Sequence, residues 1–434
     1  MLSRREMFGI GAAAAISAVG TRGQAAPAQD GPEFPNQVAS QARSAKRSGK
    51  APLRSGFDMR DGLSPRRLTM AMWDQSFVLR HGPGGSFADF DRVLKETEDR
   101  RYNVVRIDPM PQYVDLKNTA QVHDWPDRGL PFVPWSPPPG AQKTPTARWI
   151  IDFMEKLLGR STLHYTLSAW WFGWRGTHLK ATRTPENTMQ AAEMWAVMLR
   201  DWQRLFGFDR LLYVDVVNEF PFFAPYVQSR FEKETGGGWG NGAFTPTQVE
   251  WLIREINPAL AALRGEFPQL RFNLSIHGDE RWLDVPVEHD CLDVHFYADA
   301  DPRWDARTRF GARSADFFKS DRAYKDFSTR AIQASKVMAP MFRARQRAKL
   351  SNFAAMAEQR GMPLTTTESW ASWFYIDHPD LDWGWLLEWA SWTVDDAIDF
   401  GMWGWTPHNY VQPQFPNWRD VRWHRALNER FLAS

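Results

Sequence analysis

Residues 211–220 read LLYVDVVNEF, and this stretch decides the fold of the 434-residue chain. Its run of leucine, tyrosine and valine predicts a buried strand. The strand ends in Asn218 and Glu219, and Phe220 follows at once. A buried strand that delivers a carboxylate into an aromatic-rich loop indicates a catalytic group at the edge of a sheet.

A second glutamate also lies at the end of a strand-like run and is followed by an aromatic residue. Residues 363–370 read PLTTTESW, in which Glu368 ends a short strand-like run and Trp370 follows closely. Glycoside hydrolysis needs two carboxyl groups that face each other across the bond to be cleaved. The two stretches together predict an acid/base pair, Glu219 and Glu368, over a sugar site.

Strand-like and helix-like segments alternate from residue 67 to the end of the chain. Strands are expected at 68–73, 103–107, 164–168, 211–217, 271–276, 291–295, 363–367 and 401–405. Helices are expected at 87–100, 146–158, 186–206, 247–264, within 324–359, at 385–399 and at 420–431. Such alternation is typical of parallel sheets with helical crossovers. It predicts an α/β fold, a (β/α)8 or TIM barrel, as one catalytic domain over residues 67–434.

Two long insertions, 108–144 and 298–341, are expected to wall the groove, because long irregular loops in compact domains are usually functional. An open, doubly wound sheet is the alternative fold. No glycine-rich turn follows the first strand, and the glycines at 236–238 lie in a loop rather than between a strand and a helix, so the barrel is favoured.

The first 66 residues precede the barrel. Arginines at positions 4 and 5 lead into an apolar segment and an A-x-A-like site at 26–28, which predicts a Tat-type signal peptide over residues 1–28. The apolar segment is too short to span a bilayer. Residues 29–66 are expected to form a linker or N-terminal strap. The protein is therefore expected to be periplasmic or secreted.

The amino-acid composition limits the classes of binding partner and cofactor that are expected. A net charge of +2 gives no electrostatic argument for nucleic acid or an anionic membrane. The single Cys291 excludes an intrachain disulfide and a multi-cysteine metal site. None of the ten histidines lies two positions from another, and no H-E-x-x-H motif occurs, so neither a metal nor another cofactor is expected. A monomer that binds carbohydrate is expected.

Tryptophan is unusually frequent, with 23 Trp against 9 Tyr. Many of these side chains must be core. Others cluster in expected loops, where a flat apolar face with one N–H donor suits a pyranose ring. Trp170 and Trp370 are predicted to line a sugar groove.

Strand alternation predicts which side chains lie together in the site, because residues two apart in a strand share a face. Arg106 is then expected beside Val104 and Asp108, and His295 beside Asp293 and Tyr297. These polar groups gather at the carboxyl ends of the strands, where barrel active sites lie. A polar layer in which Arg106 pairs with Asp215 or Asp293 for structural reasons is the alternative.

These segments resemble the clan A glycoside hydrolases, above all the cellulase-like family 5 enzymes. The resemblance rests on NVVRI at 103–107, Asn218-Glu219, HFY at 295–297, Glu368 after the seventh strand, and Trp403 or Trp405 at the eighth. It covers about residues 67–434. One departure is clear: the family usually carries a histidine near the end of the third strand, where this chain reads TLSAW at 166–170. His277 is a candidate to fill that space.

The resemblance implies a role for each matching residue. Glu219 would be the acid/base and Glu368 the nucleophile. Asn218 would hold the sugar 2-hydroxyl, and Tyr297 would hydrogen-bond the nucleophile. A further group would bind the substrate or tune the carboxylates: Arg106, His295, Trp403 and Trp405.

The reaction requires Glu219 to be protonated and Glu368 to be ionised. Phe220 and its aromatic neighbours are expected to raise the pKa of Glu219, and Arg106 to lower that of Glu368. The resemblance favours retention of configuration through a covalent glycosyl-enzyme, on a β-linked oligo- or polysaccharide of the β-glucan or mannan class.

Asp74, Asp108 and Asp279 also follow strands and are rival catalytic carboxylates. A transglycosylase, a catalytically silent glycan-binding barrel and a metal-dependent hydrolase remain alternative functions.

Overall fold

The computed structural model describes residues 62–125, 142–171, 184–239, 242–297, 301–309, 321–370, 372, 375, 377–408 and 410–434. The predicted signal peptide and nearly all of the predicted strap lie outside these residues. Their boundaries therefore stay predictions.

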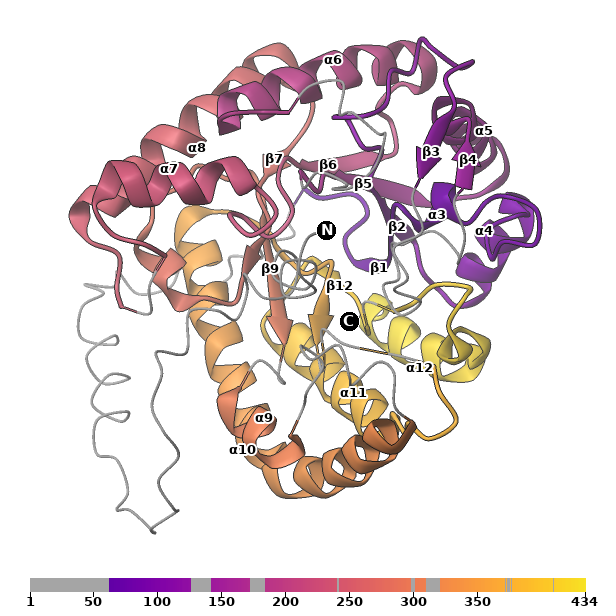
Figure 1. Cartoon of the computed structure of the whole chain (residues 1–434), viewed down its shortest axis with the longest axis vertical. Helices are drawn as coiled ribbons and strands as arrows, with labels where there is room; N and C mark the ends of the chain where they lie inside the picture. The colour runs from indigo at the N-terminus through magenta and orange to yellow at the C-terminus, as the bar shows by residue number, and fades with distance from the viewer. Residues whose placement is uncertain are drawn as a thin grey trace, which may run out of the picture.

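Six parallel strands form one curved sheet in the order β12-β1-β2-β5-β6-β7. Their bounds are β1 (Leu68–Asp74), β2 (Val104–Ile107), β5 (His164–Ser168), β6 (Leu211–Asp215), β7 (Phe272–Asn273) and β12 (Gly404–Trp405). The sheet curls like half of a barrel (Figure 1). Sequence-adjacent strands lie side by side in it, as right-handed crossovers require.

A second parallel sheet faces the open side of the first. In it β9 (Leu292–Tyr297) pairs with β8 (Ile276–His277), β10 (Leu364–Thr365) and β11 (Ser369–Trp370). Backbone hydrogen bonds join the two sheets at both seams. One runs from Asp290 N to Phe272 O at 3.0 Å, and at the other seam Trp403 N donates to Leu364 O at 2.7 Å and Thr366 N to Gly404 O at 3.2 Å. Each predicted strand segment thus contains a parallel strand. The strands are distributed over two sheets, so a continuous eight-stranded barrel stays a prediction.

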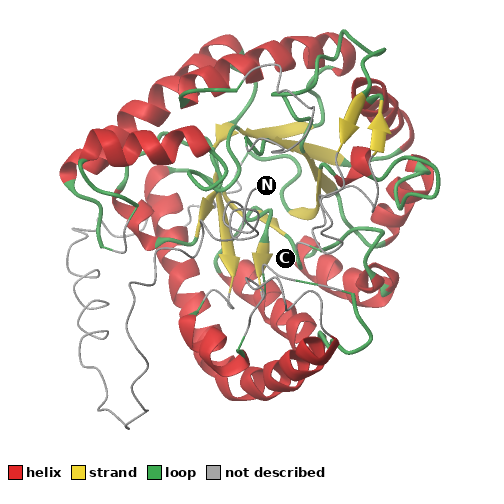
Figure 2. Cartoon of the chain, viewed as in Figure 1, coloured by secondary structure: helices red, strands yellow, loops and turns green. Residues whose placement is uncertain are grey.

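The seven predicted helices are confirmed and lie outside the strands (Figure 2). They are α4 (Phe90–Asp99), α5 (Thr146–Arg160), α6 (Thr188–Phe206), α8 (Pro246–Glu266), α10 (Asp321–Arg360), α11 (Gly384–Asp399) and α12 (Val421–Leu432). Shorter helices are α3 (Ser76–Leu79), α7 (Pro225–Thr235), α9 (Pro302–Thr308), η1 (Glu280–Asp284) and η3 (Pro416–Arg419). No helix among the described residues is long and apolar enough to cross a membrane.

The two insertions differ from the expected irregular loops where the structure describes them. The first contains a short antiparallel pair, β3 (His123–Trp125) with β4 (Gln142–Thr144). Much of the second is helical, since α9 and the first half of α10 fall within 298–341. Aromatic residues such as Trp304 and Phe342 anchor these helices against α11. The second insertion is therefore a packed wall beside the sheets.

Candidate active site

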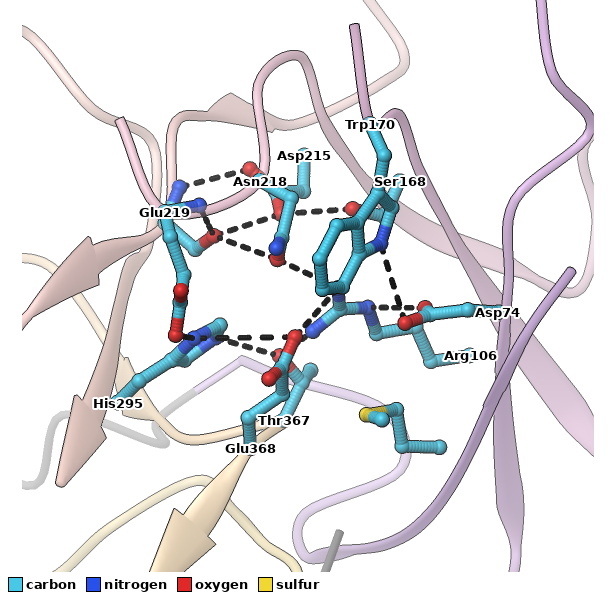
Figure 3. Close-up of polar contacts among 12 residues, drawn as sticks. Asp74, Arg106, Ser168, Trp170, Asp215, Asn218, Glu219, His295, Thr367 and Glu368 are labelled. Carbon is cyan, nitrogen blue, oxygen red and sulfur yellow. Dashed lines mark hydrogen bonds and ion pairs between the residues drawn. The ribbon is translucent and has the colours of Figure 1, made fainter. Parts of the chain in front are cut away.

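Arg106 on β2 is the centre of a buried polar network at the carboxyl ends of the strands (Figure 3). Its guanidinium forms ion pairs with Asp74 at 3.0 Å and with Glu368 at 2.9 Å. It also donates to Thr367 Oγ1 at 2.7 Å and to Asn218 Oδ1 at 2.5 Å. Only 1 % of its side chain is exposed. One cation thus fixes groups from β1, β6 and the segment after β10 in a single constellation.

Glu219 follows β6 and is held by two histidines. Its Oε1 lies 2.9 Å from His295 Nδ1 and 3.2 Å from His277 Nε2. Its backbone N–H donates to Ser275 Oγ at 2.8 Å. Its φ of 45° lies in the left-handed region, which non-glycine residues rarely adopt and which is frequent at functional sites. The local backbone thus turns the Glu219 side chain toward the histidines.

Glu368 lies across the site from Glu219. Besides its ion pair with Arg106, it accepts a hydrogen bond from the Tyr297 hydroxyl at 2.9 Å. One side-chain atom each of Glu219, His295 and Glu368 lie within 4.8 Å of one another. The two carboxylates therefore face each other at short range (Figure 3).

Asn218 directly precedes Glu219 in the chain and shares Arg106 with Glu368. Its Oδ1 accepts from Arg106 and from Ser275 Oγ, the latter at 3.3 Å. Its Nδ2 is buried and has no hydrogen-bond partner among the described residues. A buried donor without a partner costs free energy, so this amide is suited to a ligand hydroxyl.

The pKa directions of the two glutamates are opposite to those predicted. Burial alone would raise the pKa of Glu219, but the charge and hydrogen bond of His277, together with His295, bring it below its usual value. Burial raises the pKa of Glu368 well above its usual value, and Arg106 opposes this only in part, while Glu219 and Asp74 add negative charge. Arg106 cannot neutralise Glu368 fully because it also pairs with Asp74.

The alternation argument left Asp215 and Asp293 as structural partners for Arg106. The ion pairs of Arg106 are instead with Asp74 and Glu368. Asp215 accepts from Ser168 Oγ at 2.9 Å and from Ser275 N at 2.7 Å. Asp293 accepts from Tyr213 OH at 3.1 Å and from Thr367 Oγ1 at 2.9 Å. They form a supporting layer, which agrees with the alternative reading of buried polar groups as structural. Thr367 and Ser275 were missed because hydroxyl residues give no distinctive sequence signal.

The rival carboxylates have structural partners. Asp74 holds Arg106, and burial raises its pKa to about 6. Asp108 accepts from Gln75 Nε2 at 2.8 Å, and burial raises its pKa to about 7. Asp279 caps η1 and pairs with Arg281. These contacts favour Glu219 and Glu368 as the reacting pair.

The predictions for the tryptophans need correction. Trp370, Trp403 and Trp405 are fully buried, and each indole N–H is bound within the protein, to Thr406 O, Pro65 O and Thr393 Oγ1 respectively. None of the three has a free face for a sugar. Trp170 borders the site but is 2 % exposed and donates to Asp74 Oδ2 at 3.1 Å, so it positions Asp74.

The aromatic residues that keep some exposure beside the carboxylates are Phe222 and Tyr297. Phe222 packs edge-on against His277, with ring centroids 5.3 Å apart. The tilted contact between His277 and Tyr297 spans 5.7 Å. Because these rings adjoin Glu219 and Glu368, they are better placed than the buried tryptophans to contact a sugar.

Glu219, His295 and Glu368 are also spaced so that a metal ion could bridge them. Two cationic side chains already occupy the same oxygens. Arg106 contacts Glu368 Oε1, and His277 contacts Glu219 Oε1. Their positive charge repels a divalent ion and uses the lone pairs it would need, so the cluster fits acid/base chemistry better than metal binding.

An Arg106→Met variant is expected to lose about 3–5 kcal/mol of unfolding free energy, because breaking a buried ion pair leaves carboxylates unpaired. Chemical denaturation measures this loss. The control is Arg101→Met, which removes an exposed ion pair with Glu429 and should cost less than about 1 kcal/mol. Equal losses in the two variants would contradict the central role of Arg106.

The chain is similar to known proteins over most of its length. The model of the family described as sugar-binding cellulase-like matches residues 70–432. A protein of Parabacteroides distasonis ATCC 8503, assigned as a glycoside hydrolase, superposes with a TM-score of 0.69 at 25% identity, over 84% of this chain and 93% of that one.

Two endoglucanase structures are more distant. The catalytic domain of the major endoglucanase from Xanthomonas campestris pv. campestris has a TM-score of 0.45 at 11% identity, over 85% of this chain and 95% of its own. A broad-specificity endoglucanase from Clostridium acetobutylicum has a TM-score of 0.43 at 11% identity, over 87% and 100%. None of the curated proteins matches the chain significantly. Because the family match spans most of the chain, the protein belongs to the cellulase-like family and is a glycoside hydrolase.

Proposed function

We propose that the protein is a retaining hydrolase of β-linked oligo- or polysaccharides, with Glu219 as the acid/base and Glu368 as the nucleophile. The observation that carries this proposal is the short approach of the two carboxylates, whose nearest oxygens lie within 4.8 Å. Carboxyl groups about 5–5.5 Å apart are typical of retaining enzymes, whereas about 6.5–9.5 Å leaves room for the water of an inverting one.

The surroundings of Glu368 suit nucleophilic attack. Arg106 and the Tyr297 hydroxyl both contact its carboxylate and favour the charged form, against the burial that raises its pKa. Burial raises the pKa of Tyr297 well above its usual value, so the phenol keeps the proton that it donates. A sugar anomeric carbon placed between the carboxylates would then be attacked by Glu368 while the leaving oxygen receives a proton from the other side.

The proton on the leaving-group side is shared between Glu219 and His277. The 3.2 Å contact raises the pKa of His277, against burial, and lowers that of Glu219. The contact therefore favours the proton on His277 and the negative charge on Glu219. Transfer from His277 Nε2 to Glu219 would supply the carboxylic acid needed for protonation of the leaving oxygen.

A β-glucan or mannan backbone is the proposed substrate class. The Nδ2 of Asn218, which has no hydrogen-bond partner among the described residues, would donate to a sugar hydroxyl next to the cleaved bond. Export to the periplasm or beyond, a monomeric state and closure of the two sheets into one eight-stranded barrel are also proposed, on the sequence patterns described above.

The experiment is hydrolysis of a panel of β-linked glucans, mannans, xylans and galactans, with the product anomer followed by NMR from the first minutes. A β-configured first product supports retention. An α-configured first product would overturn the retaining mechanism. A product joined to an added acceptor sugar rather than to water would identify a transglycosylase.

A His277→Asn variant tests the Glu219–His277 pair through stability against pH. The raised pKa of His277 means that its contribution is present below its unfolded pKa of about 6.5 and is lost as pH rises through the folded value. The lowered pKa of Glu219 means that its contribution is present above its unfolded pKa of about 4.5 and is lost as pH falls toward the folded value. Wild type should therefore exceed the variant in unfolding free energy most near about pH 5.5, with a smaller difference near about pH 9. Urea unfolding at both pH values measures this, and a difference that grows with pH would contradict the pair.

A further inference from the structure

A cavity of about 110 Å³ opens beside the active site, behind His277 and Tyr297. Its far wall is helix α10. Four residues of that helix line it, at the i, i+3, i+4 and i+7 spacing of one helical face: Phe342, Arg345, Gln346 and Lys349. His277 contributes to the cavity and also contacts Glu219, so the cavity adjoins the reacting carboxylates.

The wall of this cavity carries surplus positive charge. Among the described residues that line it, the one carboxylate is that of Asp301, which is engaged by two guanidinium groups, those of Arg303 and Arg345. Asp301, Arg303 and Arg345 together carry a net positive charge. Lys349 adds a further positive charge on the same helical face.

Lys349 has no carboxylate partner among the described residues. Its Nζ donates to the backbone oxygen of Gly278 at 3.1 Å. The nearby acidic groups have their own partners, since Asp279 pairs with Arg281 and Glu280 accepts from Asn352. Burial lowers the pKa of Lys349 below its usual value. The charges of Glu280 and Asp279 oppose this lowering, but neither carboxylate forms an ion pair with Lys349. A part-buried ammonium group without a carboxylate in direct contact is stabilised by a ligand that supplies one.

Gln346 adds a second unsatisfied donor. Its Nε2 is buried and has no hydrogen-bond partner in the part of the chain that the structure describes. It lies one helical turn before Lys349 on the wall of the cavity. An ammonium group and an amide N–H₂ on one face form a pair of donors for an oxyanion.

We propose that this cavity is a subsite for an acidic substituent, a carboxylate or a sulfate, on the sugar next to the cleaved bond. Lys349 serves as its counter-ion and Gln346 as a second donor. The inference rests on the proposed function and deepens it, because it makes acidic β-linked glycans the favoured substrate class.

Calorimetric binding to the Glu368→Gln variant tests the subsite without hydrolysis. The probes are a β-1,4-linked glucuronate tetrasaccharide, its carboxyl-reduced neutral form, and that neutral form sulfated at the 6-hydroxyl. At least one charged probe should bind about tenfold more tightly than the neutral one or better. Raising the ionic strength from about 0.05 M to about 0.5 M should reduce this preference. The charged probe that binds identifies the substituent.

Adding Lys349→Met should abolish the preference for the charged probe and leave binding of the neutral probe unchanged. Lys349→Arg, which keeps the charge, should retain part of the preference and guards against misfolding of the first variant. The matched control is Lys336→Met, an exposed lysine of the same helix, which should change nothing.

Equal affinity for charged and neutral probes would overturn the subsite, as would a Lys349→Met variant that weakens both alike. Failure of the proposed glycosidase function would give a different set of results. Wild type would then cleave no β-linked glycan, charged or neutral, while the binding preference and its dependence on Lys349 would still be measurable.

Discussion

A Glu368→Gln variant is expected to lose about 10⁴-fold or more in kcat on every substrate that the wild type cleaves. Glutamine keeps the size and one acceptor oxygen, so contacts to Arg106 and Tyr297 can persist while the nucleophile is removed. Substrates with good leaving groups should not rescue the rate, because no covalent intermediate can form without this carboxylate. Steady-state kinetics on an aryl glycoside and on a polymer measures both effects.

The control is Asp108→Asn, a buried carboxylate whose pKa burial raises to about 7. A neutral side chain at that position resembles a form already populated near neutral pH, so activity should fall by less than about tenfold. Thermal unfolding of both variants checks that they are folded. If Glu368→Gln keeps more than a tenth of the wild-type rate, or if Asp108→Asn shows the larger loss, the nucleophile is assigned to the wrong residue.

Azide distinguishes the nucleophile from the acid/base. In a Glu368→Ala variant, azide can occupy the vacated space and attack an activated β-glycoside directly, which gives the α-glycosyl azide. The β-glycosyl azide from this variant would mean that a covalent intermediate still forms, and Glu368 would lose its role.

Much of this site could be predicted from the sequence because parallel strands impose a simple geometry. Residues at the carboxyl ends of neighbouring strands converge, so Arg106, Glu219, His295 and Glu368 meet although they come from four distant segments. The pairing of β2 with β5 and of β9 with β10 supplies that convergence. The periodicity of the strands and their order along the chain were sufficient to predict that these four residues meet.

The eighth strand shows where alternation fails. It is only two residues long, and Gly404 takes the position that faces Met70 and Thr365, where any added side chain would collide. Trp405 consequently packs outward against Phe431, and Trp403 closes the amino-terminal end beside Tyr213. A two-residue strand gives too little periodicity to predict which way its neighbours point.

The protonation pattern could not be predicted because it depends on distant contacts. The phenylalanines after Glu219 suggested a raised pKa, yet His277, fifty-eight positions later in the chain, contacts the carboxylate at 3.2 Å and reverses the direction. Arg106 was expected to keep Glu368 ionised, but it divides its charge between Glu368 and Asp74. Local sequence shows which groups are present, and only the tertiary structure shows how they share charge.

A Glu219→Ala variant is expected to separate the two chemical steps. Loss of the general acid should lower kcat/KM by about 10²–10⁴-fold on substrates with poor leaving groups, such as polysaccharides. A 2,4-dinitrophenyl glycoside needs little protonation of its leaving group and should keep most of its kcat/KM. Its kcat should become limited by breakdown of the covalent intermediate, because no base remains to activate water.

Added azide should then accelerate turnover of the Glu219→Ala variant and give the β-glycosyl azide, since it needs no base and attacks the intermediate formed on Glu368. The matched control is Asp279→Asn, an acidic residue two positions after His277 that pairs with Arg281. It should lower kcat/KM equally on both substrates, by less than about tenfold, and should show no azide effect. If Glu219→Ala reduces kcat/KM equally on the polymer and the aryl glycoside, Glu219 does not protonate the leaving group. The proton would then have to come from His277 itself, whose imidazole adjoins the same side of the site at 3.2 Å from the carboxylate.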